Sequence, residues 1–304
     1  MSEAFHSGFV SLVGRPNTGK STLLNALVGQ KLAIVADKPQ TTRTAIQGVA
    51  TLPGAQIVFV DTPGIHKADS PLNKRLMDTV RNSLEERDLL LFVADSTRPP
   101  AEEDRRAIDM VRKIGTPTLL VLNKIDLIKE KPRLLPLIDQ YRTIYDFADC
   151  FPISAAKGTG LDALRKAILD RLPEGPAYFP EDYVTDQPER FLAAELIREK
   201  VLAATRQEVP HSVAVTVDQW QETPRLTRIF ATIRVERAGQ KAIVIGTKGA
   251  VLKKIGTLAR QEMEQLFGVK IYLDLHVRLQ PRWREKPAFL NALDWRTMTG
   301  EDDT

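Results

Sequence analysis

"GRPNTGKSTLLNAL", residues 14–27, joins the apolar run Phe9–Val13 to a segment with the spacing of an amphipathic helix. Residues 14–21 fit the pattern G-x-x-x-x-G-K-S, which forms a phosphate-binding P-loop where it lies between a strand and a helix. Glycines at both ends of such a loop let successive N–H groups turn inward, next to the positive end of the helix. The stretch therefore predicts a site for a nucleoside triphosphate.

Within this loop, Lys20 is placed to reach the outer phosphates and Ser21 to bind Mg²⁺. We predict Lys20 to be catalytic as well as nucleotide-binding. The alternative is a glycine-rich turn followed by an incidental Lys-Ser pair. The full set of nucleotide contacts predicted in the loop is Gly14, Asn17, Thr18, Gly19, Lys20, Ser21 and Thr22.

Composition sets the outer bounds. The chain has 304 residues, 43% of them hydrophobic, which is enough for two domains with cores. Its single cysteine, Cys150, excludes an intramolecular disulfide and fits a reduced cytoplasmic setting. No apolar stretch approaches the length of a membrane span. A net charge of +4 permits an anionic partner without identifying one.

The first half of the chain alternates short apolar runs with segments of helical spacing. This alternation predicts an α/β fold with a doubly wound, mostly parallel sheet, and a domain over residues 1–174. Ligands of such sheets collect at the carboxyl ends of the strands. The predicted strands lie in "FVSLV", "AQIVFVD", "DLLLFVAD", "TPTLLVLNK" and "CFPIS".

"DTPG", residues 61–64, follows the second of these runs. Asp61 is placed to hold Mg²⁺, directly or through water, and the Gly64 N–H to contact the terminal phosphate, a catalytic position. Taken alone, the motif is also an ordinary Asp-Pro-Gly turn.

"NKID", residues 123–126, follows the fourth run and predicts the base. Asp126 accepts from two guanine N–H groups, and a buried Asp126 facing adenine would be left unpaired. Lys124 lies along the ring with its stem, and Asn123 braces the loop or reaches the base edge. "SAAKG", residues 154–158, then adds Ser154, Ala155 and Ala156 as nucleotide contacts, with the Ala155 N–H offered to the guanine oxygen.

These four motifs, each at a strand end, resemble the signature of a translation-factor-class GTPase domain. "PQTTRT", residues 39–44, resembles the first switch of that class. Its Thr41 or Thr42 is the expected catalytic and magnesium-binding hydroxyl once the γ-phosphate orders the loop, and spacing does not choose between them. With Ser21 and Asp61, Thr42 makes up the predicted metal site; a polar connection between elements is the alternative.

Two residues bear on hydrolysis. Many small GTPases carry a water-orienting glutamine after the DxxG glycine, but this chain has Ile65. Asn17 matches an asparagine with which related GTPases hold K⁺ beside the phosphates, and a simple turn residue is the alternative. We therefore expect GTP as substrate, Mg²⁺ as cofactor and K⁺ as a second candidate ion.

The second half changes character at "PEGPAYFPEDYVTDQPER", which predicts a linker over residues 175–189. Residues 190–304 then show helices and alternating strands typical of a smaller α+β domain. In "KAIVIGTKGAVLKKIG", residues 241–256, Gly246-Thr247-Lys248-Gly249 resembles the GXXG loop that clamps RNA in KH domains. Periodicity alone makes "KAIVI" a strand, whereas the KH resemblance makes it a short helix, which we follow.

Lysines concentrate around this loop, which predicts phosphate contacts. A solvated basic helix after a glycine turn is the alternative. The predicted RNA-binding residues are Gly246, Thr247, Lys248, Gly249, Lys253 and Lys254.

With both halves in view, "PQTTR", "DTPGIHK" and "VIGTKGAVLKKIG" resemble segments of the Era family, GTPases with a C-terminal type II KH domain. The resemblance implies binding to 16S rRNA near its 3′ end, a role in 30S subunit assembly, a monomer, and a cytoplasmic protein with peripheral contact to the inner membrane face. An ATP-driven P-loop enzyme is opposed by NKID. A GTP switch whose second domain binds the membrane or another partner stays an alternative, since a basic helix also suits anionic lipid.

Overall fold

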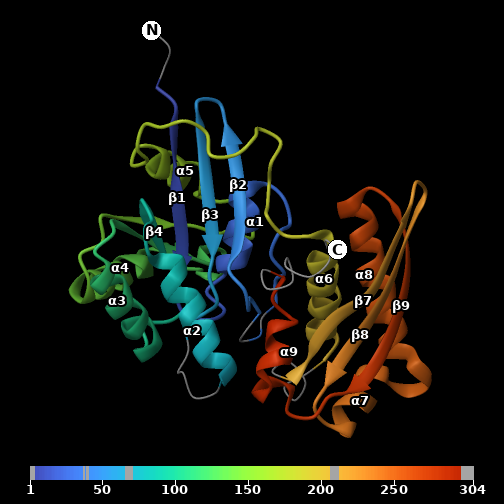
Figure 1. The fold of residues 1–304 in the computed structure, drawn as a ribbon. Helices are drawn as coiled ribbons and strands as arrows, with labels where there is room; N and C mark the ends of the chain where they lie inside the picture. The colour runs from blue at the N-terminus through green and yellow to red at the C-terminus, as the bar shows by residue number, and fades with distance from the viewer. Residues whose placement is uncertain (1–3, 37, 39–40, 66–70, 206–211, 296–304) are drawn as a thin grey trace. The chain divides into compact units, whose positions relative to one another are not determined.

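The computed structural model describes residues 4–36, 38, 41–65, 71–205 and 212–295 of the chain. It divides into two compact units, one of residues 1–69 and 73–186 and the other of residues 70–72 and 187–304. Each unit is described by itself below (Figure 1). No helix in the described ranges is both long and apolar enough to cross a bilayer.

The first unit is built on a six-stranded sheet with the order β2-β3-β1-β4-β5-β6. All neighbouring strands are parallel except β2 and β3, which form an antiparallel pair. The strands are β1 (His6–Val13), β2 (Ile46–Leu52), β3 (Ala55–Asp61), β4 (Leu89–Asp95), β5 (Thr118–Asn123) and β6 (Asp149–Pro152).

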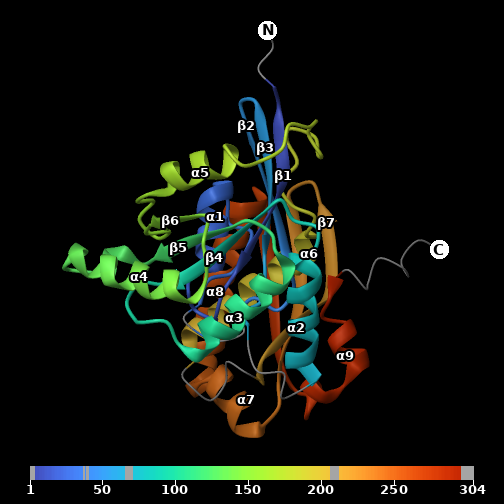
Figure 2. The same ribbon diagram turned by 90° about the vertical axis from the view of Figure 1, so that its left-hand side faces the viewer.

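Helices cover both faces of this sheet (Figure 2). One core holds Leu91 and Val93 of β4 together with α1 and α5, and the other holds Leu90 and Phe92 with α2, α3 and α4. Both faces of the sheet are buried under helices, which explains why the sequences of these strands are continuous apolar runs. The helices are α1 (Lys20–Val28), α2 (Pro71–Leu84), α3 (Glu102–Ile114), α4 (Leu134–Ile144) and α5 (Leu161–Leu169), with short 3-10 turns η1 (Ile125–Leu127) and η2 (Lys131–Arg133).

The edge strand β2 was not among the five predicted strands. As an edge strand, β2 pairs with β3 on one side, and its sequence IQGVATL has Gly48 near the middle. Its sequence therefore lacks the continuous apolar run of a strand buried within the sheet. A Cβ at Gly48 would lie 2.8 Å from Leu32 Cδ1, because α1 and its following loop pack closely on the strand here.

The segment predicted as a linker is partly ordered on the first unit, whose boundary lies at residue 186 rather than 174. The Val49 N–H of β2 donates to Val184 O (2.8 Å), and Gln56 Oε1 accepts from the N–H groups of Tyr178 and Phe179. The Val184 contact covers part of the free edge of the sheet at β2, which protects this edge from pairing with other chains. The proline-rich composition correctly indicated a segment without regular structure, but not its side-chain anchors.

The second unit runs α6-β7-β8-α7-α8-β9 and forms a three-stranded sheet with the order β7-β8-β9. β7 and β8 are antiparallel, whereas β8 and β9 are parallel. Figure 1 shows α6, α7 and α8 gathered on one side of this sheet. The elements are α6 (Glu189–Ala204), β7 (Ala214–Thr223), β8 (Leu226–Val235), α7 (Ala238–Ile245), η4 (Thr247–Gly249), α8 (Ala250–Phe267), β9 (Lys270–Leu279), η5 (Trp283–Glu285) and α9 (Pro287–Asn291).

Two features of this unit answer questions that the sequence raised. "KAIVI" is the end of helix α7, so the helix expected from the KH resemblance is confirmed and the periodicity-based strand is wrong. The C-terminal segment packs on the domain through Trp283, which is fully buried and donates from Nε1 to Ser212 O (2.9 Å).

Candidate functional site

The backbone of the P-loop requires glycine at both ends. Gly14 has φ +152° and a Cβ there would lie 2.3 Å from Val93 O. Gly19 has φ +93° and its Cβ would lie 2.3 Å from Asn123 Nδ2. The loop is thus held against two neighbouring strand ends, and no other side chain fits at either position.

Lys20 starts α1 and is buried under the loop. Its ammonium donates to Gly14 O and Arg15 O, both at 3.1 Å, which uses two of its three N–H donors on the loop. Burial lowers the pKa of Lys20 to about 8, while the nearby Asp61 carboxylate acts in the opposite direction. A phosphate above the loop would favour the charged ammonium and receive its remaining donor.

Three oxygen-bearing side chains converge beside Lys20. Ser21 Oγ donates to Asp61 Oδ2 (2.7 Å), Thr42 Oγ1 lies 3.1 Å from the same oxygen, and the two hydroxyls are 2.8 Å apart. Burial raises the pKa of Asp61, against Lys20 and the two hydroxyl bonds, which lower it. Asp61 Oδ1 is buried with no hydrogen-bond partner among the described residues.

This cluster fits Mg²⁺, which prefers hard oxygens and is held in proteins by one or two carboxylates together with phosphates and water. A cation would compensate the buried carboxylate and its orphaned oxygen. No group of three or more His, Cys, Asp or Glu side chains suited to a metal occurs in the described ranges.

The two switch threonines point to different places. Thr42 is buried at the oxygen cluster, whereas the Thr41 hydroxyl donates within its own loop, to Ala36 O (3.1 Å) and Lys38 O (2.6 Å). The structure thus brings Thr42, and not Thr41, to Asp61. Residues 39 and 40 of the predicted switch lie outside the described residues.

Asn123 ties the three loops of the site together. Its Nδ2 donates to Thr18 O (2.9 Å) in the P-loop, and its Oδ1 accepts from the N–H groups of Lys124 (2.8 Å) and Ala155 (2.9 Å). Of the two roles left open for Asn123, the structure shows bracing. It also corrects the expectation for Ala155, because the N–H expected to face guanine is already donated to Asn123.

Asp126 is exposed in η1, not buried as the selectivity argument assumed. Ser154 Oγ donates to its Oδ1 (2.6 Å) and sets the direction of the carboxylate. The predicted selectivity for guanine therefore does not come from a carboxylate that is already buried. The cost of leaving Asp126 unpaired against adenine arises only when the bound base itself covers the carboxylate. Ala156, the next predicted contact, is also exposed.

Lys124 contacts both the P-loop and Asp95, a residue that the sequence analysis missed. Its ammonium forms an ion pair with Asp95 Oδ2 (2.9 Å) and donates to Asn17 O. Burial raises the pKa of Asp95, but hydrogen bonds from Thr97 and Lys124 outweigh it and hold the pKa below its ordinary value. Asp95 ends β4, and that position at the carboxyl end of a parallel strand was the available signal.

Gly64 and Ile65 both serve the packing of the loop. A Cβ at Gly64 would lie 2.7–2.8 Å from atoms of Pro16. Ile65 donates its N–H to Gly14 O (3.3 Å), and its side chain is 2% exposed in the core beneath α2. The isoleucine that replaces the usual glutamine is therefore a core residue, turned away from solvent.

A cavity of about 90 Å³ opens over the P-loop and switch segment. Thr18 does not line it, because its side chain is fully buried and its hydroxyl donates to Arg15 O (3.2 Å). Among the predicted residues the lining includes Asn17, Gly19, Lys20, Ser21, Thr22, Thr41, Thr42, Gly64 and Lys124; Pro16, Ile34, Val35, Ala36 and Lys38 line it in addition.

The GXXG loop of the second unit joins α7 to α8. Gly246 has φ +71° and its Cβ would lie 2.4 Å from Val251 Cγ2, whereas a Cβ at Gly249 would meet nothing within 4 Å. The Gly246 N–H donates to Ala242 O and the Gly249 N–H to Gly246 O, so both of these N–H groups are already used within the protein. Lys248 occupies a left-handed conformation at the tip.

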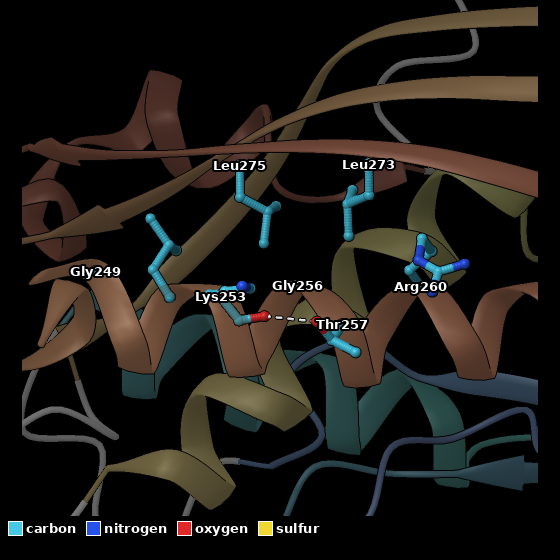
Figure 3. Close-up of a pocket in the computed structure, with 8 residues that line it drawn as sticks. Gly249, Lys253, Gly256, Thr257, Arg260, Leu273 and Leu275 are labelled. Carbon is cyan, nitrogen blue, oxygen red and sulfur yellow. Dashed lines mark hydrogen bonds between the residues drawn. The ribbon is translucent and has the colours of Figure 1, made fainter.

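A cleft of about 380 Å³ runs from this loop along α8 and β9 (Figure 3). In the figure, Leu273 and Leu275 point from the strand toward the helix, and Lys253 and Arg260 lie on the helix side. Sequence analysis missed most of this lining, although the spacing 249-253-256-260 marks one helical face. Lys254 is exposed outside the lining, which comprises Gly249, Leu252, Lys253, Gly256, Thr257, Arg260, Leu273 and Leu275.

Comparison with known proteins covers both units. Residues 9–124 match the family model described as 50S ribosome-binding GTPase, and residues 208–284 match the KH domain model. GTPase Era of Geobacter metallireducens is 50% identical over 96% of this chain and 98% of its own. GTPase Era of Syntrophus aciditrophicus is also 50% identical, over 96% of this chain and 95% of its own.

Two solved structures agree with these relatives. One is Era in complex with MgGDPNP and nucleotides 1506–1542 of 16S ribosomal RNA, and the other is a variant of Aquifex aeolicus Era bound to GDP and AlF4⁻. Each has 42% identity and a TM-score of 0.92, covering 96% of this chain and 99% of its own. With a P-loop unit, a KH unit and full-length similarity to curated relatives, the chain belongs to the Era family of GTPases.

Proposed function

We propose that this GTPase is a monomeric switch that binds 16S rRNA near its 3′ end through the KH cleft and acts in 30S subunit assembly. The observation that carries the proposal is the full-length similarity to an Era whose crystal structure contains MgGDPNP and nucleotides 1506–1542 of 16S rRNA. This chain has a candidate pocket for each of those two ligands, one in each unit.

At the nucleotide site, Lys20 binds the outer phosphates with the donor that it does not spend on the loop. Ser21, Thr42 and Asp61 hold Mg²⁺, which neutralises charge on the phosphates when bound. Asp126, aligned by Ser154, accepts from the two guanine donors, and the Lys124 stem lies along the ring. Backbone N–H groups of the P-loop and of Gly64 surround the phosphates.

The metal role of Thr42 is tested by Thr42→Ala, with Thr41→Ala as the matched control because both hydroxyls belong to the same loop. We expect Thr42→Ala to raise the Mg²⁺ concentration that gives half-maximal turnover and to lower kcat. Thr41→Ala keeps the Oγ1 of Thr42 beside Asp61 and should change the Mg²⁺ dependence much less. Equal effects of the two substitutions would contradict the assignment.

Hydrolysis proceeds without a water-orienting side chain at position 65, because Ile65 is buried in the core. We propose that Asn17, exposed at the cavity, holds K⁺ beside the phosphates in its place. Turnover should then be faster in K⁺ than in Na⁺, and Asn17→Ala should abolish the difference. Identical turnover of the unmodified protein in the two salts, with and without RNA, would reject this role.

At the RNA site, the apolar side chains of the cleft receive bases, and Lys253 and Arg260 of the cleft contact the RNA backbone. Lys248, at the tip of the GXXG loop, contacts the RNA backbone as well. A KH cleft of this kind holds about four nucleotides. The double substitution Thr247→Asp/Lys248→Asp puts negative charge at the loop tip and keeps both glycines. It should weaken binding of a single-stranded RNA from the 16S 3′ end at least about tenfold.

The matched control is Arg142→Asp/Thr143→Asp, which makes the same change in charge at exposed positions of α4 in the first unit. It should leave RNA affinity unchanged. Binding to anionic vesicles, measured on the same variants, tests the alternative partner. Undiminished RNA affinity of a folded Thr247/Lys248 variant would refute the RNA role of the cleft.

A further inference from the structure

The sheet of the second unit has one face that α6, α7 and α8 leave uncovered. On β8, Ile229, Ala231 and Ile233 are fully buried under the helices, and the alternate residues Arg228 and Phe230 lie on the opposite face. Figure 1 shows α6, α7 and α8 on one side of the three strands only.

One end of this outer face is occupied by the C-terminal segment. Arg234 lies over the Phe289 ring (5.6 Å to the centroid) and pairs with Asp218, while Arg284 forms a salt bridge with Glu236. The other end, around Phe230 and Tyr272, stays accessible. The segment therefore covers part of the face and leaves the rest open.

The open part combines aromatic rings with cations. Tyr272 is 50% exposed, and its ring lies 6.1 Å from that of Phe230. Arg228 is in register with Tyr272 on the neighbouring strand and is exposed. We call this surface the outer aromatic patch, and it consists of Arg228, Phe230, Lys270, Tyr272, Asp274 and His276.

The chemistry of the patch matches single-stranded nucleic acid. Bases stack on exposed aromatic rings and on guanidinium planes, and they do so on open sheets. Arg228 and Lys270 contribute two positive charges, and Asp274, which lies 3.7 Å from His276, contributes one negative charge. The net positive sign is complementary to phosphates.

The patch is also continuous with the RNA cleft of the proposed function. β9 is an edge strand whose Leu273 and Leu275 line the cleft, and the alternating Tyr272 and Asp274 lie on the outer face of the same strand. An RNA that passes over this edge moves from one surface to the other without leaving the protein. An RNA longer than the four or so nucleotides of a KH cleft needs such a second surface.

We propose that the outer aromatic patch is a second binding site for single-stranded RNA, which takes nucleotides adjoining those in the cleft by stacking on Tyr272. The site rests on the proposed RNA-binding function. It extends the footprint of the RNA beyond the cleft and across the edge of the sheet.

The test compares RNAs of two lengths on the full chain. A labelled RNA of about four nucleotides from the 16S 3′ end fills the cleft, and RNAs of about 14 nucleotides extend that core at the 5′ or the 3′ end. Tyr272→Ala should weaken binding of one of the long RNAs at least about fivefold, because one stacked base is lost. Binding of the short RNA should stay unchanged, and Tyr272→Phe, which keeps the ring, should bind both as the unmodified protein does.

Charge variants give effects of opposite sign. Arg228→Gln should weaken the same long RNA and reduce the slope of log affinity against log salt by about 0.7, as for one lost phosphate contact on a single strand. Asp274→Asn removes the negative charge of the patch and should strengthen binding of the same long RNA. Arg133→Gln, a 74% exposed arginine of the first unit, is the control and should change nothing.

Equal affinity of Tyr272→Ala and the unmodified protein for both long RNAs would overturn the proposal. So would an equal loss for short and long RNAs, since Tyr272 would then act through the cleft. The Thr247→Asp/Lys248→Asp variant keeps the two claims separate. If it binds the short RNA normally, the cleft assignment fails, and the patch is still judged by the Tyr272→Ala result with the long RNAs.

Discussion

Replacing Asn123 with alanine would remove the brace between the P-loop and the base loops. The side chain is 3% exposed and makes three hydrogen bonds. Its loss leaves the Thr18 carbonyl and the Lys124 and Ala155 N–H groups without this partner. Each orphaned buried group costs about 1–3 kcal/mol, so we expect the free energy of unfolding of the first unit to fall by about 3 kcal/mol or more.

Urea denaturation without nucleotide measures this loss, because no ligand contact then contributes. All three tryptophans, Trp220, Trp283 and Trp295, lie in the second unit, so their fluorescence follows that unit while far-UV circular dichroism follows both. The unfolding transition of the first unit is the one that circular dichroism detects and tryptophan fluorescence does not. Its midpoint should fall by about 1.5 M urea for an m value of about 2 kcal/mol per M. Tryptophan fluorescence should not move.

Asp126→Asn is the matched control. Asp126 is exposed, and asparagine keeps an oxygen for Ser154 Oγ, so the urea midpoint should stay unchanged while the preference for GTP over ATP weakens. An Asn123→Ala protein that keeps its midpoint but loses GTP binding would refute the bracing argument. Asn123 would then act by direct contact with the base.

Three further predictions concern single residues. Gly64→Ala places a Cβ 2.7–2.8 Å from Pro16, so it should displace the P-loop and reduce GTP affinity and kcat, whereas unchanged steady-state kinetics would count against the close packing. Burial raises the pKa of Cys150 to about 11, so its thiolate is scarce at pH 8. Alkylation of Cys150 at pH 8 should therefore be roughly 100-fold slower than that of a free thiol, and it should accelerate tenfold per pH unit as the pH rises toward 11. Fast labelling at pH 8 would contradict this. Trp283→Ala should lower the free energy of unfolding of the second unit by about 3–5 kcal/mol and Trp283→Phe by less, as followed by thermal unfolding; a neutral alanine variant would mean that the C-terminal segment does not stabilise the domain.

The sequence by itself determined the features that depend on local backbone chemistry. The P-loop glycines, the position of Lys20 at the start of a helix and the alternation of strands and helices all follow from spacing within a few residues. The KH resemblance likewise predicted the short helix α7, where periodicity alone gave a strand. Such features can be predicted because the residues that determine them lie within the same short stretch of sequence.

Only the tertiary structure decided which groups of neighbouring residues face the site. Thr41 and Thr42 are adjacent and chemically alike, and the fold of their loop alone brings Thr42 to Asp61. Asp95 and the Ala155 N–H acquire their partners from strands and loops far apart in the chain. Spacing carries no information on such long-range partners.

The same reason explains the RNA surfaces. The cleft needs α8 and β9 side by side, and the outer aromatic patch needs the register of β8 on β9, which places Arg228 beside Tyr272. Those pairings arise when apolar faces are buried against each other, and a linear pattern shows each face without showing its neighbour. Local sequence patterns thus predicted a phosphate site and a GXXG loop. Tertiary packing determined the shape, the lining and the hydrogen-bond partners of both sites.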